Sequence, residues 1–307
     1  MVSLFMTGAS GFVGRHFLAR YAGKFDEIIL PLRKDPGEDY PANVTVKRVR
    51  GTPDEIANLL LMSPCNIVLN CAAYGVSPGA RDPSDMAALN VELPVLLAKS
   101  AQKIGAQKFV QLGSMSEYIP PTTSRPTTET DLLLGDVAGY GGSKAEASRQ
   151  LKALSASGET QISCLRLFGI YGPGEGPHRL LVSLYNTLSS DAVAPMSPGT
   201  QIRDFIYIYD VIDAMYCAIE KPLPTKFTAL NIGSGDGVSV ARFAKTFCRV
   251  AGFSIDKLNL GALPLRDTDV AYMVANIRAA KSVLNWEPKW SQESALKNYS
   301  DYLSSSF

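Results

Sequence analysis

Thr7-Gly8-Ala9-Ser10-Gly11-Phe12-Val13-Gly14 follows the first apolar run of the chain, Val2–Met6, and opens an amphipathic segment. Gly8 permits a tight turn, Gly11 lets a ligand approach the backbone, and Gly14 allows a helix to pack closely on a strand. The amino end of a helix also offers unpaired N–H groups and a partial positive charge. The pattern therefore predicts a site for the pyrophosphate of a dinucleotide, with a plain tight turn as the alternative. The residues expected to line this site are Gly8, Ser10, Gly11, Phe12, Val13 and Gly14.

Short apolar runs alternate with amphipathic segments through the first half of the chain. The expected strands are Val2–Met6, Glu27–Leu30, Val44–Lys47, Asn66–Asn70, Lys108–Leu112 and Ile162–Leu167. The expected helices are Gly11–Tyr21, Pro53–Met62, Asp82–Ile104 and Ala138–Ser155. This alternation predicts an α/β fold with a doubly wound parallel sheet of the Rossmann type and right-handed crossovers.

The pattern becomes irregular after Arg166, where glycines and prolines mark several connections. The elements expected there are a strand at Arg203–Ile208, a helix at Asp210–Glu220, a strand at Ala229–Ile232 and a last helix carrying Asn276–Trp286. We therefore expect a dinucleotide-binding domain over residues 1–166, with a return segment at about 203–232. Residues 167–307 are expected to form a smaller lobe for the substrate.

Composition narrows the classes of partner. The 307 residues include 30 basic and 29 acidic side chains, so the net charge of +1 provides no global field for nucleic acid or an anionic membrane surface. No apolar run approaches the length of about 18 residues that a membrane span needs, and no charged leader precedes the first strand. Two histidines and no carboxylate cluster with ligand spacing predict that no metal is bound.

The cysteines indicate the compartment. Their number is odd and no CxxC pair occurs, which predicts reduced thiols in a cytoplasmic protein. The five cysteines are Cys65, Cys71, Cys164, Cys217 and Cys248.

The residues after the second strand bear on the choice of dinucleotide. An NAD site usually has an Asp or Glu there to accept hydrogen bonds from the ribose hydroxyls. This chain reads Pro31-Leu32-Arg33-Lys34, without a carboxylate. Arg33 and Lys34 can pair with a 2′-phosphate, although two basic residues after a strand are also commonly just solvated. The sequence favours NADP(H), with NAD(H) as the alternative.

A second motif, Gly139-Tyr140-Gly141-Gly142-Ser143-Lys144, opens the helix expected at Ala138–Ser155. Tyr140 and Lys144 are four residues apart and so share one helical face. A tyrosine with its ordinary pKa of about 10 needs a nearby cation to exchange a proton near neutrality. Lys144 is expected to supply that charge, while an exposed helix face is the alternative for this pair taken alone.

Together these motifs resemble the extended short-chain dehydrogenase/reductase family, in its nucleotide-sugar-modifying branch. The resemblance runs in order along nearly the whole chain. The segments that carry it are Thr7–Gly14, Asn70-Cys71-Ala72-Ala73, Asp82-Pro83 with Asn90, Phe109–Tyr118, Tyr140 with Lys144, Leu165–Pro173, Arg203–Tyr207, Asn231–Gly235, and Leu265–Val270 with Asn276 to Pro288.

The resemblance implies a role for each motif residue. Tyr140 exchanges the proton at the reacting oxygen, Ser114 hydrogen-bonds the same oxygen, and Lys144 lowers the pKa of the tyrosine and holds the nicotinamide ribose. Ser116 and Tyr118 are expected to line the substrate pocket. Further residues expected to contact the cofactor are Cys71, Ala72, Ala73, Asn90 and Leu112.

In the second half, the resemblance implies that Arg203 and Arg266 face a nucleotide diphosphate, which suits the donor geometry of guanidinium groups. A surface ion pair with Asp204 or Asp267 is the alternative for each arginine. His178 and Arg179 follow a glycine- and proline-rich loop and are expected to touch the nucleotide. For the histidine, simple exposure on a loop is the alternative.

Two departures from the family pattern affect the chemistry. Gly169 stands where many members carry an asparagine that helps to hold the substrate. Met115 and Ser116 stand where the 4,6-dehydratases of the family carry an Asp-Glu pair, and Glu117 is one position too late. Dehydration is therefore disfavoured.

These observations predict NADPH-dependent reduction of a nucleotide-linked 4-keto-6-deoxy (or dideoxy) sugar. The first alternative is an NAD-dependent nucleotide-sugar 4-epimerase, and the second is a non-catalytic dinucleotide sensor. The resemblance also implies a homodimer formed through the helices at Asp82–Ile104 and Ala138–Ser155.

Overall fold

The computed structural model describes residues 1–34, 40–77, 79–266 and 269–306. Its main element is a sheet of seven parallel strands in the order β10-β6-β5-β4-β1-β2-β3. The strands are β1 (Ser3–Thr7), β2 (Glu27–Leu32), β3 (Val44–Arg48), β4 (Ile67–Asn70), β5 (Lys108–Ser114), β6 (Gln161–Leu167) and β10 (Phe227–Ile232). The predicted α/β fold with a doubly wound sheet is confirmed. The strand order reverses between β1 and β4, which is where ligands bind at the carboxyl edge of such sheets.

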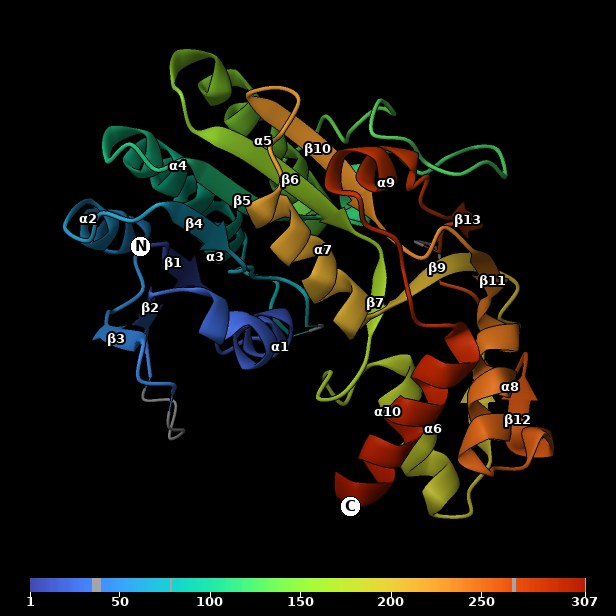
Figure 1. Cartoon of the computed structure of the whole chain (residues 1–307). Coiled ribbons are helices and arrows are strands. Elements are labelled where there is room, and N and C mark those ends of the chain that lie inside the picture. The colour runs from blue at the N-terminus through green and yellow to red at the C-terminus, as the bar shows by residue number, and fades with distance from the viewer. Residues whose placement is uncertain (35–39, 78, 267–268, 307) are drawn as a thin grey trace.

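Helices cover both faces of the sheet (Figure 1). One face carries α2 (Pro53–Leu61), α4 (Leu93–Lys103) and α5 (Gly139–Leu154), and the other carries α1 (Phe12–Tyr21) and α7 (Ile208–Glu220). Because successive side chains of a strand point to opposite faces, Leu4 and Met6 join the core beneath α1 and α7, while Phe5 joins the core beneath α2 and α4.

The long helix expected at Asp82–Ile104 is interrupted. It consists of α3 (Pro83–Met86), a π-helical stretch at Ala87–Glu92 (η2), and α4. Single π-helical stretches within α-helices frequently occur at functional sites, and this one carries Asn90.

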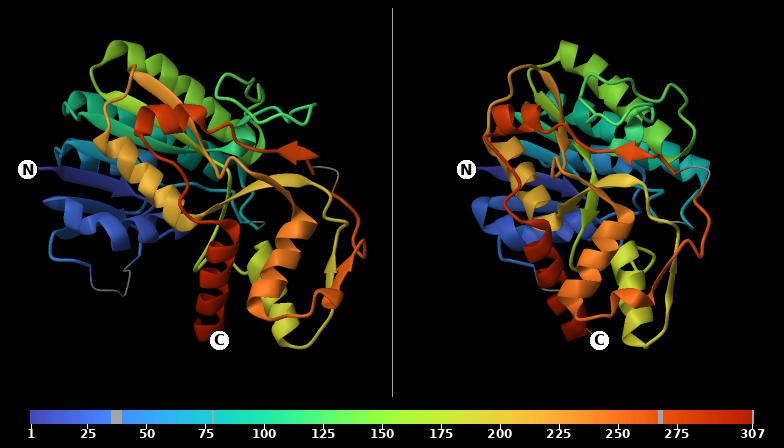
Figure 2. Two further views of the ribbon diagram at one scale, coloured as in Figure 1. Left: turned by 45° about the vertical axis from the view of Figure 1, so that its right-hand side comes forward. Right: turned by 90° about the vertical axis from the view of Figure 1, so that its right-hand side faces the viewer.

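The second half builds a smaller lobe around β9 (Ile202–Tyr207), which pairs with β7 (Gly169–Tyr171), β11 (Gly237–Ser239) and β13 (Tyr272–Met273). Within the return segment expected at about 203–232, α7 and β10 pack on or join the large sheet, whereas β9 lies in this second sheet. Figure 2 shows the helices of this lobe gathered beside β9. Its remaining elements are α6 (Leu180–Ser189), α8 (Val240–Ala251), α10 (Gln292–Ser306) and the paired strands β8 (Ala194–Met196) and β12 (Leu258–Leu260).

The helix expected at Asn276–Trp286 is α9, which spans only Arg278–Leu284 and ends at Asn285 in the left-handed conformation. Helices α6, α8 and α10 were not predicted from the sequence. Short 3-10 turns complete the chain at Ala22–Lys24 (η1), Met115–Glu117 (η3), Ser155–Ser157 (η4) and Ile255–Lys257 (η5).

Among the described residues, no helix is both long and apolar enough to cross a bilayer. Within the same residues, no group of three or more His, Cys, Asp and Glu side chains is arranged to hold a metal ion. All five cysteines are free thiols.

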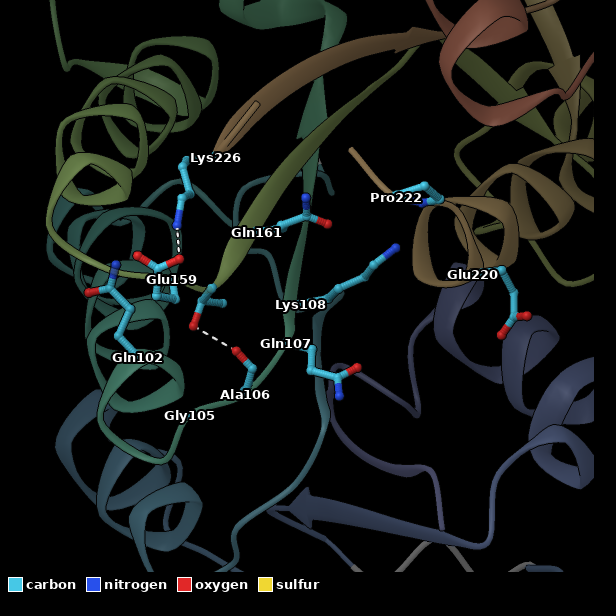
Figure 3. Close-up of a pocket in the computed structure, with 11 residues that line it drawn as sticks. Gln102, Gly105, Ala106, Gln107, Lys108, Glu159, Gln161, Glu220, Pro222 and Lys226 are labelled. Atoms are coloured by element: carbon cyan, nitrogen blue, oxygen red, sulfur yellow. Dashed lines mark hydrogen bonds and ion pairs between the residues drawn. The ribbon is translucent and has the colours of Figure 1, made fainter. Parts of the chain in front are cut away.

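A hollow of about 670 Å³ lies at the amino edge of β5, β6 and β10, the edge opposite to the strand ends that carry the motifs. Charged residues of its lining are engaged in structural contacts. Lys226 pairs with Glu159 (Figure 3). The ammonium of Lys108 donates to the carbonyl oxygen of Ala218 at 3.2 Å. We assign this hollow no part in the chemistry.

Candidate active site

The glycine turn lies at the carboxyl end of β1. Gly8 has φ +68°, and a Cβ on it would lie 2.5 Å from the backbone nitrogen of Ala72. A Cβ on Gly14 would lie 2.2 Å from the carbonyl oxygen of Gly8, so the start of α1 presses directly on the turn. These contacts require glycine at both positions for the reasons expected from the sequence.

The amino end of α1 suits an anion. Gly11 occupies the cap position and offers no side chain to the first N–H groups, and the first turn contains no acid. The unpaired N–H groups and the helix dipole therefore remain available to a pyrophosphate. This arrangement fits a dinucleotide placed at the reversal of strand order; the individual contacts expected from Ser10, Phe12 and Val13 stay predictions.

Buried polar bonds fix the loop after β4 beside the turn. The amide of Asn70 accepts hydrogen bonds from the Thr7 hydroxyl at 2.5 Å and the Ala72 backbone N–H at 3.1 Å, and donates to Gln111 Oε1 at 2.8 Å. Cys71 next to it is not activated, because burial raises the pKa of its thiol. The loop thus places the backbone of Ala72 against the glycine turn, and the cofactor contacts expected for Cys71, Ala72 and Ala73 stay predictions.

Asn90 binds protein atoms on several sides. Its amide donates to the Tyr74 carbonyl oxygen at 2.9 Å and to Ser143 Oγ at 3.0 Å, and accepts from the Tyr74 N–H at 2.9 Å. The side chain therefore ties the loop after β4 to α5, the helix of Tyr140. The contact with the cofactor expected for Asn90 stays a prediction.

Ser114 and Tyr140 meet at the carboxyl end of β5. The Ser114 hydroxyl lies close enough to the Tyr140 phenol to lower the pKa of that phenol. Their approach depends on glycine, because a Cβ on Gly141 would lie 2.2 Å from the Ser116 carbonyl oxygen. The structure therefore brings together the two hydroxyls that the sequence analysis assigned to the reacting oxygen.

The pKa of Tyr140 is raised to about 12, chiefly because the phenol is buried. The Ser114 hydroxyl and the charge of Arg179 oppose this rise, while the charge of Glu117 adds to it.

Lys144 is held at the carboxyl end of β5. Its buried ammonium donates to the Leu112 carbonyl oxygen at 2.6 Å, and burial lowers its pKa. The expectation that this lysine lowers the pKa of the tyrosine stays a prediction. The cofactor contacts expected for Leu112 and Lys144 stay predictions.

Glu117 and Arg166 form a buried ion pair, Nε to Oε2 2.9 Å, beneath Ser114. Glu117 also accepts from the Ser114 backbone N–H at 2.8 Å and from the Ser148 hydroxyl at 2.6 Å. Its carboxylate therefore fixes the end of β5 and faces away from the reacting groups, as its sequence position indicated.

Tyr118 was expected to line the substrate pocket, and this expectation is wrong. Its side chain is 1% exposed, accepts a hydrogen bond from Arg166 at 2.8 Å and donates to Asn231 at 2.6 Å. Arg166, which is paired with Glu117, thus also binds the Tyr118 hydroxyl in the interior. Ser116 is exposed at the same turn, and its contact with the substrate stays a prediction.

Arg203 and Arg266 lie on either side of one carboxylate. Asp269 approaches Arg203 Nη2 at 3.8 Å and accepts from the backbone N–H of Arg266 at 3.1 Å. Asp204, the first alternative partner, is instead buried beneath the turn after β10, where it accepts from the Ser234 and Gly235 N–H groups at 2.6 and 3.0 Å. Asp267, the other alternative, lies outside the described residues. Diphosphate binding by the two arginines stays a prediction.

Arg33 and Lys34 are exposed directly after β2, and neither forms an ion pair within the described parts of the chain. Arg33 lies along the Gly51 backbone, where a Cβ would come within 2.5 Å of its Cδ. The contact of Arg33 and Lys34 with a 2′-phosphate stays a prediction.

His178 is exposed on the loop after β7, whereas Arg179 is anchored on it. Arg179 donates to the Ile170 carbonyl oxygen at 2.9 Å and pairs with Glu175 at 3.6 Å. Glu175 is buried, and burial raises the pKa of its carboxyl to about 7. Nucleotide contact by His178 and Arg179 stays a prediction.

The structure explains one departure from the family pattern. A Cβ on Gly169 would lie 2.5 Å from the carbonyl oxygen of Asp204, because β7 and β9 pair at this point. The backbone thus excludes the asparagine that many family members carry there. The position contributes no side chain to a substrate.

Several residues that organise the site were not predicted from the sequence. Glu117 was expected only as a carboxylate one position too late for the dehydratase acid pair, Arg166 was expected only within a strand, and Asp269 and Glu175 were given no role. Charged residues inside an apolar strand, such as Arg166 in Leu165-Arg166-Leu167, are the one available signal, since a buried charge requires a partner.

The fold and the site define a dinucleotide-binding protein with a Ser-Tyr hydroxyl pair at the edge of a doubly wound sheet. The family model for the NAD dependent epimerase/dehydratase family matches residues 4–233. The chain belongs to this family, which confirms the resemblance to extended short-chain dehydrogenases/reductases of the nucleotide-sugar branch.

Individual relatives cover nearly the whole chain. A UDP-glucose 4-epimerase from Bacillus subtilis (strain 168) is 26% identical over 94% of this chain and 93% of its own length. A dTDP-6-deoxy-L-talose 4-dehydrogenase (NAD(P)(+)) from Kitasatospora kifunensis is 24% identical over 94% and 92%. The structure of a UDP-glucuronic acid 4-epimerase from Bacillus cereus, in complex with UDP-glucuronic acid and NAD, is similar with TM-score 0.85 and 21% identity over 100% of both chains.

Proposed function

We propose that this protein reduces the 4-keto group of a nucleotide-linked 6-deoxy (or dideoxy) sugar with NADPH. The observation that carries the proposal is that the Ser114 and Tyr140 hydroxyls meet at the same carboxyl edge of the sheet that carries the glycine turn. Two neighbouring hydroxyls suit the reduction of a carbonyl group to an alcohol. One hydroxyl can donate a proton to the carbonyl oxygen, and the other can donate a hydrogen bond to the same oxygen.

NADPH would supply the hydride when it is bound, and this chain's residues would handle the oxygen and its proton. Tyr140 donates its proton to the carbonyl oxygen as negative charge develops there, and Ser114 stabilises the same oxygen by a hydrogen bond. Lys144 holds the ribose with the donors that Leu112 leaves free. The phenolate of Tyr140 then regains a proton from solvent.

The absence of a dehydratase acid pair supports reduction over elimination of water. Met115 and Ser116 carry no carboxyl group, and the carboxylate of Glu117 is held by Arg166. The dTDP-6-deoxy-L-talose 4-dehydrogenase relative supports redox chemistry at C4 of a deoxysugar.

The preference for NADPH rests on Arg33 and Lys34, the exposed cations after β2. The similar Bacillus cereus structure contains NAD, so NAD(H) is the alternative cofactor. Nucleotide-sugar binding is supported by the UDP-sugar in that complex and by the positions of Arg203 and Arg266 next to Asp269.

The proposal is tested in two measurements on purified protein. Thermal unfolding with UDP, GDP, CDP and TDP identifies the nucleotide, since the ligand that binds the folded state raises the midpoint. The matching 4-keto sugar nucleotide should then consume one NADPH per alcohol formed. No consumption with any of the four nucleotide series would contradict the proposal.

A nucleotide-sugar 4-epimerase is the second candidate, favoured by the full-length similarity to the Bacillus subtilis UDP-glucose 4-epimerase. An epimerase uses the same hydroxyl pair but returns the hydride to the sugar. Stoichiometric NAD that survives gel filtration, together with isomerisation and no net NADPH consumption, would decide for it. A dinucleotide sensor without catalysis ranks last, because Tyr140 and Lys144 are both present.

We also propose a cytoplasmic homodimer. A groove between η2/α4 and α5 is lined by apolar side chains, among them Val91, Val95, Leu96 and Val137. A second copy of the chain would cover this apolar surface. Sedimentation of the wild type and of Val95→Glu should give a dimer and a monomer respectively.

A further inference from the structure

A further hollow lies on the smaller lobe, outside the candidate active site. It encloses about 560 Å³, within the range of about 300–1,000 Å³ that small-molecule sites have. The connection between α9 and α10, residues 285–291, runs past β7 and forms one wall (Figure 1). The other walls come from β9, the turn after β10 and the start of α7. Among the described residues that line it, none was expected to contact the cofactor or the substrate.

The connection between α9 and α10 is fixed on the first turn of α7. The buried carboxylate of Asp210 accepts hydrogen bonds from the backbone N–H groups of Lys289 at 2.8 Å and Trp290 at 3.2 Å. The indole N–H of Trp286 donates to the Asp210 carbonyl oxygen at 3.1 Å. Asp210 therefore holds in place the wall of the hollow that carries Trp290.

Trp290 is an aromatic side chain that the fold leaves uncovered. Its ring is 36% exposed and lines the hollow, whereas Trp286 is buried. The ring centroid lies 5.0 Å from that of Tyr207 and 5.9 Å from that of Tyr209. The two tyrosines support the indole, which thus forms a fixed apolar surface with a polar edge.

Planar polar side chains line the same hollow. Asp236 lies on the turn after β10, and Gln292 begins α10. A carboxylate and an amide can each bond two neighbouring hydroxyl groups. A pyranose ring matches this combination, because its C–H bonds form an apolar face and its hydroxyl groups project from the edge of the ring.

The charges of the lining disfavour a phosphate. Of the two lysines in it, Lys281 is paired with Glu287 at 3.2 Å. The ammonium of Lys289 is outnumbered by the carboxylates of Asp210 and Asp236 in the same lining. The hollow thus lacks the excess of positive charge that attracts a phosphate, and an uncharged ligand suits it better.

We propose that this hollow binds the uncharged pyranose ring of a saccharide. One face of the sugar would lie on the Trp290 indole, and its hydroxyl groups would bond to Asp236 and Gln292. A free monosaccharide and the end of a glycan chain offer the same chemistry. This inference goes beyond the proposed function, because the hollow lies apart from the residues that would carry out the reduction.

The test is saturation-transfer NMR on the whole purified protein. The probes are methyl β-glucopyranoside, methyl α-rhamnopyranoside and maltotriose, with AMP as a stacking ligand that carries a phosphate. We expect transfer to the ring protons of at least one saccharide, and about fivefold weaker transfer in Trp290→Ala, because the aromatic contact is lost. Transfer to a methyl glycoside would indicate a free sugar as the source, and transfer to maltotriose alone would indicate a glycan chain.

Trp290 also packs on Tyr207, so Asp236→Ala, on an exposed turn, serves as a second variant and should weaken the transfer as well. Tyr302→Ala removes an exposed aromatic ring elsewhere on α10 and is the matched control, which should keep the signal.

Three results would overturn the proposal: no transfer to any of the saccharides, transfer to AMP alone, or unchanged transfer in folded Trp290→Ala. Where Trp290→Ala does not fold, Asp236→Ala decides in the same way. Since neither cofactor nor turnover is involved, the result is independent of whether the proposed reduction is found.

Discussion

The carboxyl edge of the large sheet and the wall built on β9 both carry candidate site residues, but different contacts hold them. At the sheet edge, close backbone contacts that only glycine permits place Gly8, Ser114 and Tyr140. On β9 and the segment after it, the carboxylate of Asp269 contacts the Arg203 guanidinium and the backbone N–H of Arg266. The first region supports chemistry that many substrates share, and the second is where a particular nucleotide would be selected.

Removing the phenol tests the sheet edge. We expect Tyr140→Phe to lower kcat about a thousandfold, since general acid catalysis contributes effects of that order, and to leave cofactor binding unchanged. Steady-state kinetics and a cofactor titration measure the two quantities. Tyr216→Phe, on the outer helix α7, is the control and should keep full activity. A loss of less than tenfold would remove Tyr140 from the chemistry.

The second test concerns the buried pair beneath Ser114. Arg166→Met leaves the buried carboxylate of Glu117 without its cation, which should lower the free energy of unfolding by about 4 kcal/mol. Urea unfolding measures this change. Adding Glu117→Gln to the variant should restore part of the loss, because no uncompensated charge then remains. If the double variant is less stable than the single one, the ion pair is not the source of the loss.

The third test uses pH. The pKa of Glu175 is about 7 in the folded protein and about 4.5 in an unfolded chain, so the folded state binds the proton more tightly. The stabilisation is fully present below pH 4.5 and is lost as the pH rises through 7, by up to about 3 kcal/mol. Glu175→Gln should flatten the dependence of unfolding free energy on pH between these values. The exposed Glu293→Gln should retain it.

The smallest effect is expected at the cofactor ribose. Arg33→Ala combined with Lys34→Ala should raise KM for NADPH about tenfold, as expected for lost charge-assisted hydrogen bonds to a 2′-phosphate, and leave KM for NADH unchanged. Equal effects on both cofactors would show that these cations do not select the phosphate.

The two regions also differ in how much of their structure could be predicted from the sequence. The seven-stranded sheet, the glycine turn and the meeting of Ser114 with Tyr140 were predictable because each rests on a short motif and on the general rules of parallel sheets, which bring the strand ends to one edge. The direction of the Lys144 ammonium, the burial of Tyr118 and the Asp269 contacts were not predictable. Each is decided by a partner from another strand or loop, such as the Leu112 carbonyl or the Arg166 guanidinium.

The helices of the smaller lobe illustrate the same limit. Helices α6 and α8 pack on each other, and α10 packs on α8. The burial of their apolar faces therefore depends on a partner helix that the local sequence does not identify. Gly169 was noted as a departure from the family, but its cause lies on β9, at the carbonyl oxygen of Asp204.

Transfer of a labelled hydride tests the central claim most directly. The protein is incubated with NADPH deuterated at the transferable C4 position and a nucleotide-linked 4-keto sugar, and the product is analysed by mass spectrometry. We predict one deuterium on the sugar with the wild type and none with Tyr140→Phe. A sugar product that carries no label with the wild type would contradict the assignment of reduction to the Ser114–Tyr140 pair.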